Sequence, residues 1–258
     1  MSVRRTPVWV LGLTGLVYLF LHVPVIVLMV FSFNASRFGV GWTGFTLEWY
    51  RRLFAREDIL QGLGRSLLVG LLTALLATAF GTLLALALGR RRFRGRRAVE
   101  ALLVLPIVTP EIVVGISLLL LFALLGVPLG LGTITIAHVA FSVAFVAVVV
   151  RARLEGMDTS LEEAALMLGA DEPAAFRTVT LPLLLPGIAA GALLAFTLSF
   201  DDYVITSFVA GTGSSTLPMV VYSMVRRNIE PTINAISTIV VAGTALLLVL
   251  ADRLRRSA

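Results

Sequence analysis

Long apolar runs alternate with short polar stretches along this chain. Six runs are long enough to cross a bilayer as helices, which takes about 20 residues each. They cover residues 8–31, 63–88, 98–125, 132–150, 183–207 and 233–251. The pattern predicts an all-α protein, a polytopic transmembrane bundle of about six helices. A conspicuous polar stretch, residues 151–182, interrupts it and is called the polar insert below.

The polar insert contains residues that typically start and end two short helices. Ser160 and Glu163 have the spacing of a capping box, which predicts that Ser160 caps the first helix. Gly169 predicts its end, because glycine adopts the left-handed conformation without strain. Asp171 opens a second helix, and Pro182 is expected to break it.

The insert has two alternative interpretations. A DNA-binding helix-turn-helix has a similar spacing, but residues 158–172 contain five acids and no base, which phosphates would repel. We therefore expect no nucleic-acid partner. A plain solvated loop remains an alternative, although such loops seldom combine these helix start and stop residues.

The amino-acid composition limits the chemical functions that this chain can have. Of the 258 residues, 58% are hydrophobic and 14% are charged, which indicates an integral membrane protein. The chain has no cysteine and no lysine, so thiolate chemistry and ATP hydrolysis by a Walker A lysine are excluded. His22 and His138 are far apart in sequence. We expect a non-enzymatic chain that binds no cofactor or metal itself.

The positions of the arginines predict the orientation of the chain in the membrane. They cluster at residues 4–5, 90–97, 151–153 and 253–256, which fall in alternate loops. The positive-inside rule makes this side cytoplasmic, together with both termini and the polar insert. Residues 34–62 also carry arginines, but their aromatic residues suggest an interfacial helix with anchors in the membrane belt. The first apolar run is too long for a signal peptide and is expected to remain as an anchor.

A family resemblance rests on the insert. The pattern Glu163-Ala164-Ala165-x3-Gly169-x9-Val179-x-Leu181-Pro182 resembles the EAA motif of membrane permeases in binding-protein-dependent ABC importers. Residues 105–122, 198–211 and 217–239 are similar to spermidine/putrescine permeases of the PotC type. Arg65 and Ala144 depart from the pattern of such permeases, and Val179 replaces the usual isoleucine.

The resemblance implies a type I importer permease with the MetI-like fold. Residues 1–258 would form one permease domain, with the helix at 8–31 as a peripheral anchor, a core at 62–251, and the insert as coupling loop. The implied partners are two copies of an ATPase carrying ATP and Mg²⁺, a second homologous permease, an extracytoplasmic solute-binding protein and membrane lipid. The location implied is the bacterial inner membrane.

The same resemblance implies that the first insert helix docks on the ATPase. Small alanines would allow close approach, acidic side chains would meet arginines of the ATPase, and apolar side chains would add contact. The implied ATPase-coupling residues are Leu161, Glu162, Glu163, Ala164, Ala165, Leu166, Met167, Gly169, Leu181 and Pro182.

Four residues are candidates for a substrate pathway. Asp201 and Asp202, near the end of the fifth run, could receive a cationic substrate or simply cap the next helix. Tyr203 could add a cation–π face. Glu111 follows two prolines in the third run, where an unpaired charge would cost at least about 2.5–3.5 kcal/mol, so it either lines a wet pathway of a broken helix or is structurally satisfied.

The expected function is a permease subunit of an ATP-driven importer for polyamines or a related small amine. Opines, polyols, phosphonates or ferric ions are alternative cargoes of the same class. A different class, an ion-coupled secondary transporter, is disfavoured by the absence of an internal repeat.

Overall fold

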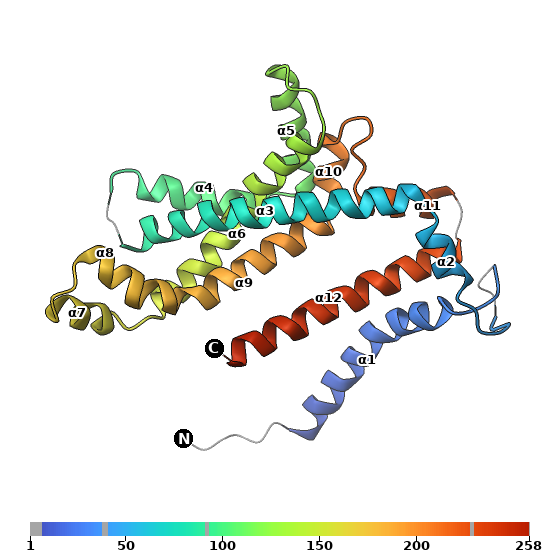
Figure 1. Cartoon of the computed structure of the whole chain (residues 1–258), viewed down its shortest axis with the longest axis horizontal. Coiled ribbons are helices and arrows are strands. Elements are labelled where there is room, and N and C mark those ends of the chain that lie inside the picture. Colours follow the sequence, from blue (N-terminus) through green and yellow to red (C-terminus); the bar gives the residue numbers. More distant parts are fainter. Residues whose placement is uncertain (1–6, 38–40, 91–92, 228–229, 258) are drawn as a thin grey trace. The chain divides into compact units, whose positions relative to one another are not determined.

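The computed structural model describes residues 7–37, 41–90, 93–227 and 230–257, and these are mostly helical (Figure 1). Their Cα positions form two compact units, residues 1–59 with 221–258 and residues 60–220. The grouping of the whole chain into one permease domain stays a prediction. The helices are α1 (Val8–Phe31), α2 (Glu48–Phe54), α3 (Glu57–Arg90), α4 (Arg96–Val108), α5 (Glu111–Leu124), α6 (Leu131–Glu155), α7 (Ser160–Met167), α8 (Glu172–Ala175), the π-helical turn η1 (Phe176–Thr180), α9 (Leu181–Phe200), α10 (Val204–Val209), α11 (Leu217–Arg227) and α12 (Pro231–Ser257).

The first unit packs α12 against α1 and α2. Helix α2 confirms the short helix predicted within residues 34–62. Trp49 on this helix is 6% exposed, and its indole Nε1 donates to the Asn34 carbonyl at 2.8 Å. The expectation that the loop aromatics are membrane-belt anchors is therefore wrong for Trp49, because its indole is buried and hydrogen-bonded within the protein.

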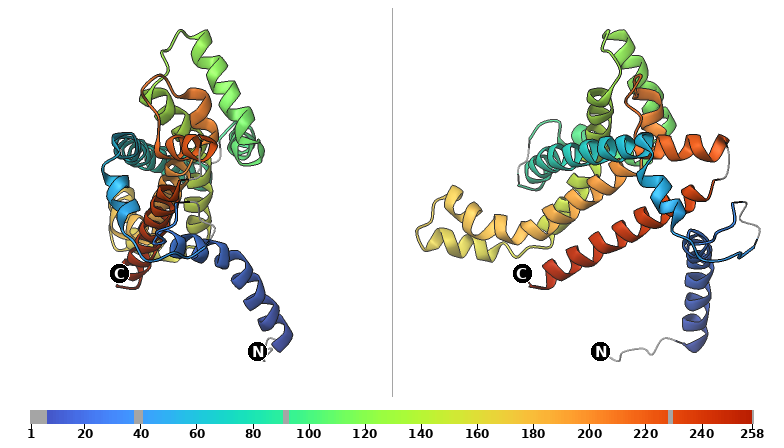
Figure 2. Two further views of the ribbon diagram at one scale, coloured as in Figure 1. Left: turned by 90° about the vertical axis from the view of Figure 1, so that its right-hand side faces the viewer. Right: turned by 45° about the vertical axis from the view of Figure 1, so that its right-hand side comes forward.

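The second unit is built around α6 and α9, which lie side by side (Figures 1 and 2). Small residues allow the close approach. A Cβ on Gly187 of α9 would come within 2.8 Å of Arg153 on α6, and one on Gly81 of α3 within 2.7 Å of Val146. A core cluster fills this region, formed by Ala77, Ala85, Val146, Val150, Leu184 and Ala195. These contacts fix the helix ends from which the polar insert projects.

A second core cluster lies where α10 packs against α5 and α6. Its buried members are Val69, Phe122, Ile134, Ala137, Phe141, Ile205 and Val209. Because α10 has only six residues, its position depends on this tertiary packing rather than on helix propensity.

Four helical stretches of the described residues are long and apolar enough to span a membrane: Trp9–Phe31, Glu57–Arg90, Leu131–Glu155 and Glu172–Phe200. A fifth span arises if α4 and α5 are counted together, although they meet at a bend of 112°. Thr109 is extended before Pro110, as expected of a residue preceding proline, which confirms the predicted break. The apolar part of α12 is shorter, Pro231–Leu246, so a sixth span stays a prediction.

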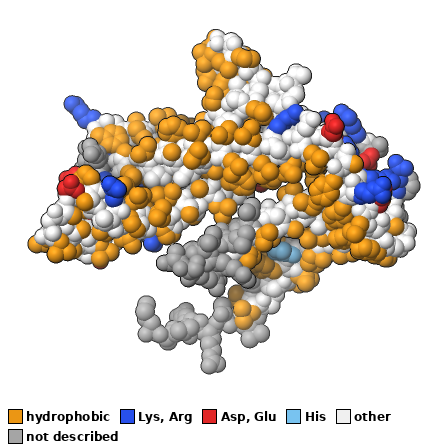
Figure 3. All heavy atoms as spheres, in the orientation of Figure 1, with side chains coloured by type: hydrophobic (Ala, Val, Ile, Leu, Met, Phe, Trp, Pro, Cys, Tyr) orange, Lys and Arg blue, Asp and Glu red, His pale blue; other side chains and the backbone are white. Residues whose placement is uncertain are grey.

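Hydrophobic side chains are spread widely over the face shown in Figure 3, where charged side chains form a few small groups. The α1 stretch Trp9–Phe31 has no buried residues. Such continuous apolar faces are suited to lipid contact, as the hydrophobic pattern predicted.

Candidate functional sites in the polar insert and at the end of α9

The polar insert contains two helical segments joined by a tight turn, as predicted. The predicted capping box is wrong, however. Thr159 is the N-cap residue of α7 and makes no side-chain capping bond, while Asp158 Oδ1 accepts from the Ser160 N–H at 2.9 Å. This hydrogen bond lowers the pKa of the Asp158 carboxyl, and a hydrogen bond from the Ser160 hydroxyl lowers it further. The acid two residues upstream replaces the expected serine cap.

The turn after α7 depends on Gly169. Its φ is +94°, in the region that favours glycine, and the Ala170 N–H donates to the Ala165 carbonyl at 3.1 Å. Asp171 then caps α8 by accepting from the Ala174 N–H at 2.8 Å. These two features confirm the predicted end of the first helix and start of the second.

Replacing Gly169 by valine should strain this turn by about 1 kcal/mol or more, because a β-branched residue disfavours positive φ. We expect a protein that still inserts but transports poorly, measured as uptake at equal membrane abundance. Gly169→Asn is the matched control, since asparagine tolerates the left-handed region. Normal uptake by the valine variant would show that the turn geometry is unimportant.

Pro182 does not break the second helix. Helix α8 continues through η1 into α9, and Pro182 lies in the first turn of α9. Within η1 the Leu181 N–H donates to the Phe176 carbonyl, five residues earlier. Proline lacks an N–H and disturbs a regular α-helix. The π-helical turn lies just before this proline and lets the helix continue through it. Such turns often mark functional sites.

Helix α7 presents exposed apolar side chains. Leu161 is 49% exposed and Leu166 is 40% exposed, while Met167 and Leu168 are each 89% exposed. Leu168 was not among the predicted coupling residues, although its place beside Met167 could have indicated it. Glu163 and Ala164 are also exposed, and Ala165 is partly exposed. An apolar tip at a polar loop is typical of a protein-docking surface.

Glu162 is paired within the chain, and the expectation that both glutamates meet arginines of the ATPase stays a prediction. Arg90 Nη1 donates to its Oε1 at 2.9 Å, Arg90 Nη2 donates to its Oε2, and the Thr180 hydroxyl donates to Oε2 at 2.8 Å. Burial raises the pKa of Glu162, but these hydrogen bonds outweigh burial and leave the pKa below its usual value. A cavity of about 760 Å³ lies beside these residues, between the ends of α3, α6 and the insert.

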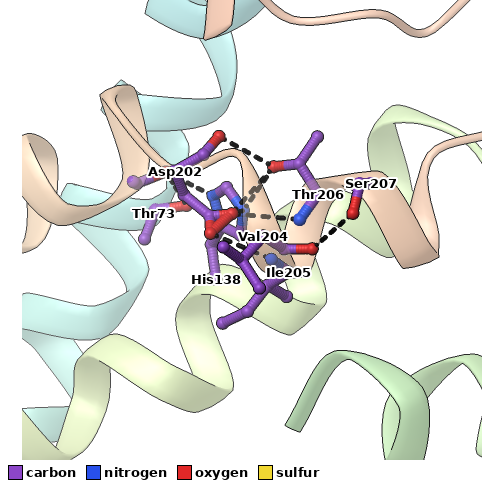
Figure 4. Close-up of polar contacts among 8 residues, drawn as sticks. Thr73, His138, Asp202, Val204, Ile205, Thr206 and Ser207 are labelled. Atoms are coloured by element: carbon purple, nitrogen blue, oxygen red, sulfur yellow. Dashed lines mark hydrogen bonds and ion pairs between the residues drawn. The ribbon is translucent and has the colours of Figure 1, made fainter. Parts of the chain in front are cut away.

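A second polar site lies where α9 ends (Figure 4). The side chain of Asp202 is 8% exposed, and its two oxygens accept from the N–H groups of Ile205 and Thr206 at 3.1 and 3.0 Å. His138 Nε2 lies 3.4 Å from Asp202 Oδ2. Asp202 therefore holds the start of α10, which favours the capping interpretation for this residue.

His138 continues the network into the core. Its side chain is 2% exposed, with Nδ1 2.7 Å from Ser199 Oγ and Nε2 3.0 Å from Thr206 Oγ1. Ser199 also contacts Thr73 Oγ1 at 3.2 Å, which brings in α3. His138 is thus a packed polar residue that joins α6, α9, α10 and α3.

Asp201, the neighbouring acid, is exposed and lies beside a cavity of about 320 Å³. Glu111 and Tyr203 line the same cavity, so the structure brings together the four predicted pathway residues. Glu111 is the first residue of α5, where the positive end of the helix dipole favours a carboxylate. Sequence reasoning missed Ser142 in the cavity wall, which is 1% exposed and whose Oγ has no hydrogen-bond partner among the described residues.

Metal binding has no support in the described residues, which contain no group of three His, Asp or Glu side chains suited to a metal ion. The polar groups at the end of α9 instead form a paired network and an acidic cavity. This arrangement can bind or guide a cation.

Residues 77–257 match the family described as "Binding-protein-dependent transport system inner membrane component". The chain belongs to this family. It is 44% identical over 243 residues to the spermidine/putrescine transport system permease protein PotC of Escherichia coli (strain K12), covering 94% of this chain and 92% of that protein. It is 41% identical over 253 residues to the putrescine transport system permease protein PotI of the same strain, covering 95% and 90%.

Solved structures confirm the fold. The chain has a TM-score of 0.72 and 19% identity to a chain of a bacterial ABC transporter involved in the import of the acidic polysaccharide alginate, covering 96% of this chain and 95% of that chain. The MetNI methionine ABC transporter gives a TM-score of 0.64 at 19% identity, covering 82% and 98%. The family match and its relatives show that the protein is a non-catalytic inner-membrane permease component of a binding-protein-dependent transport system, and the solved structures show its MetI-like fold.

Proposed function

We propose that this chain is one permease subunit of an ABC importer that takes up spermidine, putrescine or a related small amine. The main support is its 44% and 41% identity, over at least 94% of its length, to permeases whose names specify these polyamines. The acidic cavity lined by Asp201 and Glu111 adds chemical support, because ammonium groups favour carboxylates in a low-dielectric setting.

The proposed assembly contains a second homologous permease, two copies of an ATPase that binds ATP and Mg²⁺, and an extracytoplasmic binding protein. Both termini and the polar insert lie on the cytoplasmic side. The proposed docking helix is α7, whose exposed Leu161, Leu166 and Met167 would contact the ATPase together with Glu163 and the two alanines. Leu168 joins this surface because of its exposure.

The proposed mechanism couples ATPase docking near the start of α9 to contact with the amine near its end. Closure of the ATPase dimer displaces α7, and the bundle changes between inward- and outward-open states. The turn at Gly169 and the continuous helix from α8 through α9 provide a path, with Leu181 and Pro182 in the first turn of α9. Asp201, Glu111 and Tyr203 would contact the amine in transit, whereas Asp202 would hold the adjoining helix.

Reconstitution tests the proposal. The full complex in proteoliposomes, with binding protein outside and ATP inside, should accumulate labelled spermidine, and unlabelled putrescine should compete. Competition by an opine or a polyol, with none by putrescine, would redirect the cargo within the same importer class. Uptake by the permease alone in response to an ion gradient would contradict the importer and favour a secondary transporter.

A further inference from the structure

The end of α3 meets the polar insert at Arg90. Besides its two bonds to Glu162, its Nη2 donates to Thr180 Oγ1 at 2.9 Å. Its guanidinium carbon lies 5.7 Å from the ring centre of Phe176, within cation–π range. One side chain thus contacts α7 through Glu162 and η1 through two further residues.

Helix α7 needs such a contact to move as one body with the membrane helices. It has eight residues, about two turns, and helices this short are not stable by themselves. It is bounded by the turn after Gly156 and by Gly169, both points where the backbone changes direction. Within the described residues, every side-chain hydrogen bond that joins α7 to another helix involves Glu162.

The geometry of the contact suits force transmission. Two guanidinium nitrogens meet the two carboxylate oxygens, and such bidentate pairs restrict orientation as well as distance. The side chains of Arg90 and Glu162 are 34% and 27% exposed, so neither is fully screened by water. A lysine could supply the charge but not the planar pairing.

We propose that Arg90 and Glu162 form a clamp that passes the movement of α7 directly to α3. Arg90 and Glu162 are positioning residues, since neither has to touch the cargo or the nucleotide. This inference rests on the proposed coupling role of α7. It adds a direct route to α3, beside the covalent routes from the insert into α6 and α9.

The test uses the complete importer in proteoliposomes and measures labelled spermidine transported per ATP hydrolysed. Arg90→Gln and Glu162→Gln should keep the ATPase bound and active but lower this ratio about fivefold, the effect of a small shift in a two-state equilibrium. Arg90→Lys should recover only part of it. The reversed pair, Arg90→Glu with Glu162→Arg, should restore the ratio.

Arg97→Gln is the matched control, because Arg97 is exposed near the same end of the protein and forms no ion pair among the described residues. An unchanged ratio in both glutamine variants would overturn the clamp. Loss of the ATPase from the Arg90→Gln complex would also overturn it, since the contact would then serve assembly. If the single variants fail to insert, the reversed pair decides: a restored ratio supports the clamp and a low ratio in an inserted complex refutes it.

Failure of the coupling role itself gives a different result. In that case charged substitutions at Met167 and Leu168 would leave the ATPase bound and active. If those substitutions remove the ATPase while the Arg90 and Glu162 variants transport normally, α7 is the docking helix and only the clamp is wrong.

Discussion

Replacing Asp202 by alanine should destabilise the protein, whereas the same change at Asp201 should leave it folded. The Asp202 carboxylate is 8% exposed and accepts bonds from two backbone N–H groups and the Thr206 hydroxyl. Its removal leaves the two N–H groups without their acceptor and takes a charge partner from His138, which keeps its contacts to Ser199 and Thr206. We expect a cost of about 3 kcal/mol. Thermal unfolding of the purified complex should show the difference between the two variants.

Asp202→Asn serves as the shape-matched comparison. An amide keeps the volume and one acceptor oxygen, so its loss of stability should be smaller than that of the alanine variant. Equal unfolding temperatures for the Asp201 and Asp202 variants would contradict the division of roles between the two acids.

The expected effect of Asp201→Asn is on uptake. Asp201 is exposed beside the cavity that also contains Glu111, so its charge remains available to a cation. At an effective dielectric constant of about 20, one charge pair at contact is worth a few kcal/mol, and uptake of labelled spermidine should fall about tenfold or more. Asp201→Glu keeps the charge and should retain most uptake, while normal uptake by the asparagine variant would remove Asp201 from the pathway.

Local signals in the sequence predicted much of the fold. The apolar run at 8–31 became α1 without a change of boundary, the prolines indicated the break between α4 and α5, and Gly169 marked the end of α7. Each is decided by residues within a few positions of one another. The prediction that Pro182 breaks the second helix was wrong, because the π-helical turn just before it lets the helix continue into α9. A rule based on proline alone does not include such a turn.

The sites were predicted less completely because their partners are distant in sequence. Arg90 and Glu162 are 72 residues apart, and His138 contacts Ser199 across 61 residues. No local pattern pairs such residues. The adjacent acids Asp201 and Asp202 look equivalent in sequence, yet the chain turns between α9 and α10, so one carboxylate is buried and the other is exposed.

The tip of α7 should give the largest effect on assembly. Met167 and Leu168 are each 89% exposed, and burying such side chains against a partner contributes about 1.5–3 kcal/mol each. Replacing both by glutamate removes this contribution and places two charges in the contact. The ATPase should bind about 100-fold more weakly or worse, which co-purification and ATP-dependent uptake would both report.

The matched control exchanges the two side chains, Met167→Leu with Leu168→Met, which keeps apolar area and volume and should preserve binding. The glutamate variant should still insert normally, because these side chains are exposed and their removal costs the folded chain little. Loss of the ATPase with intact insertion would therefore locate the defect at the interface rather than in the fold. Full retention of the ATPase would mean that the exposed apolar tip of α7 contacts something else.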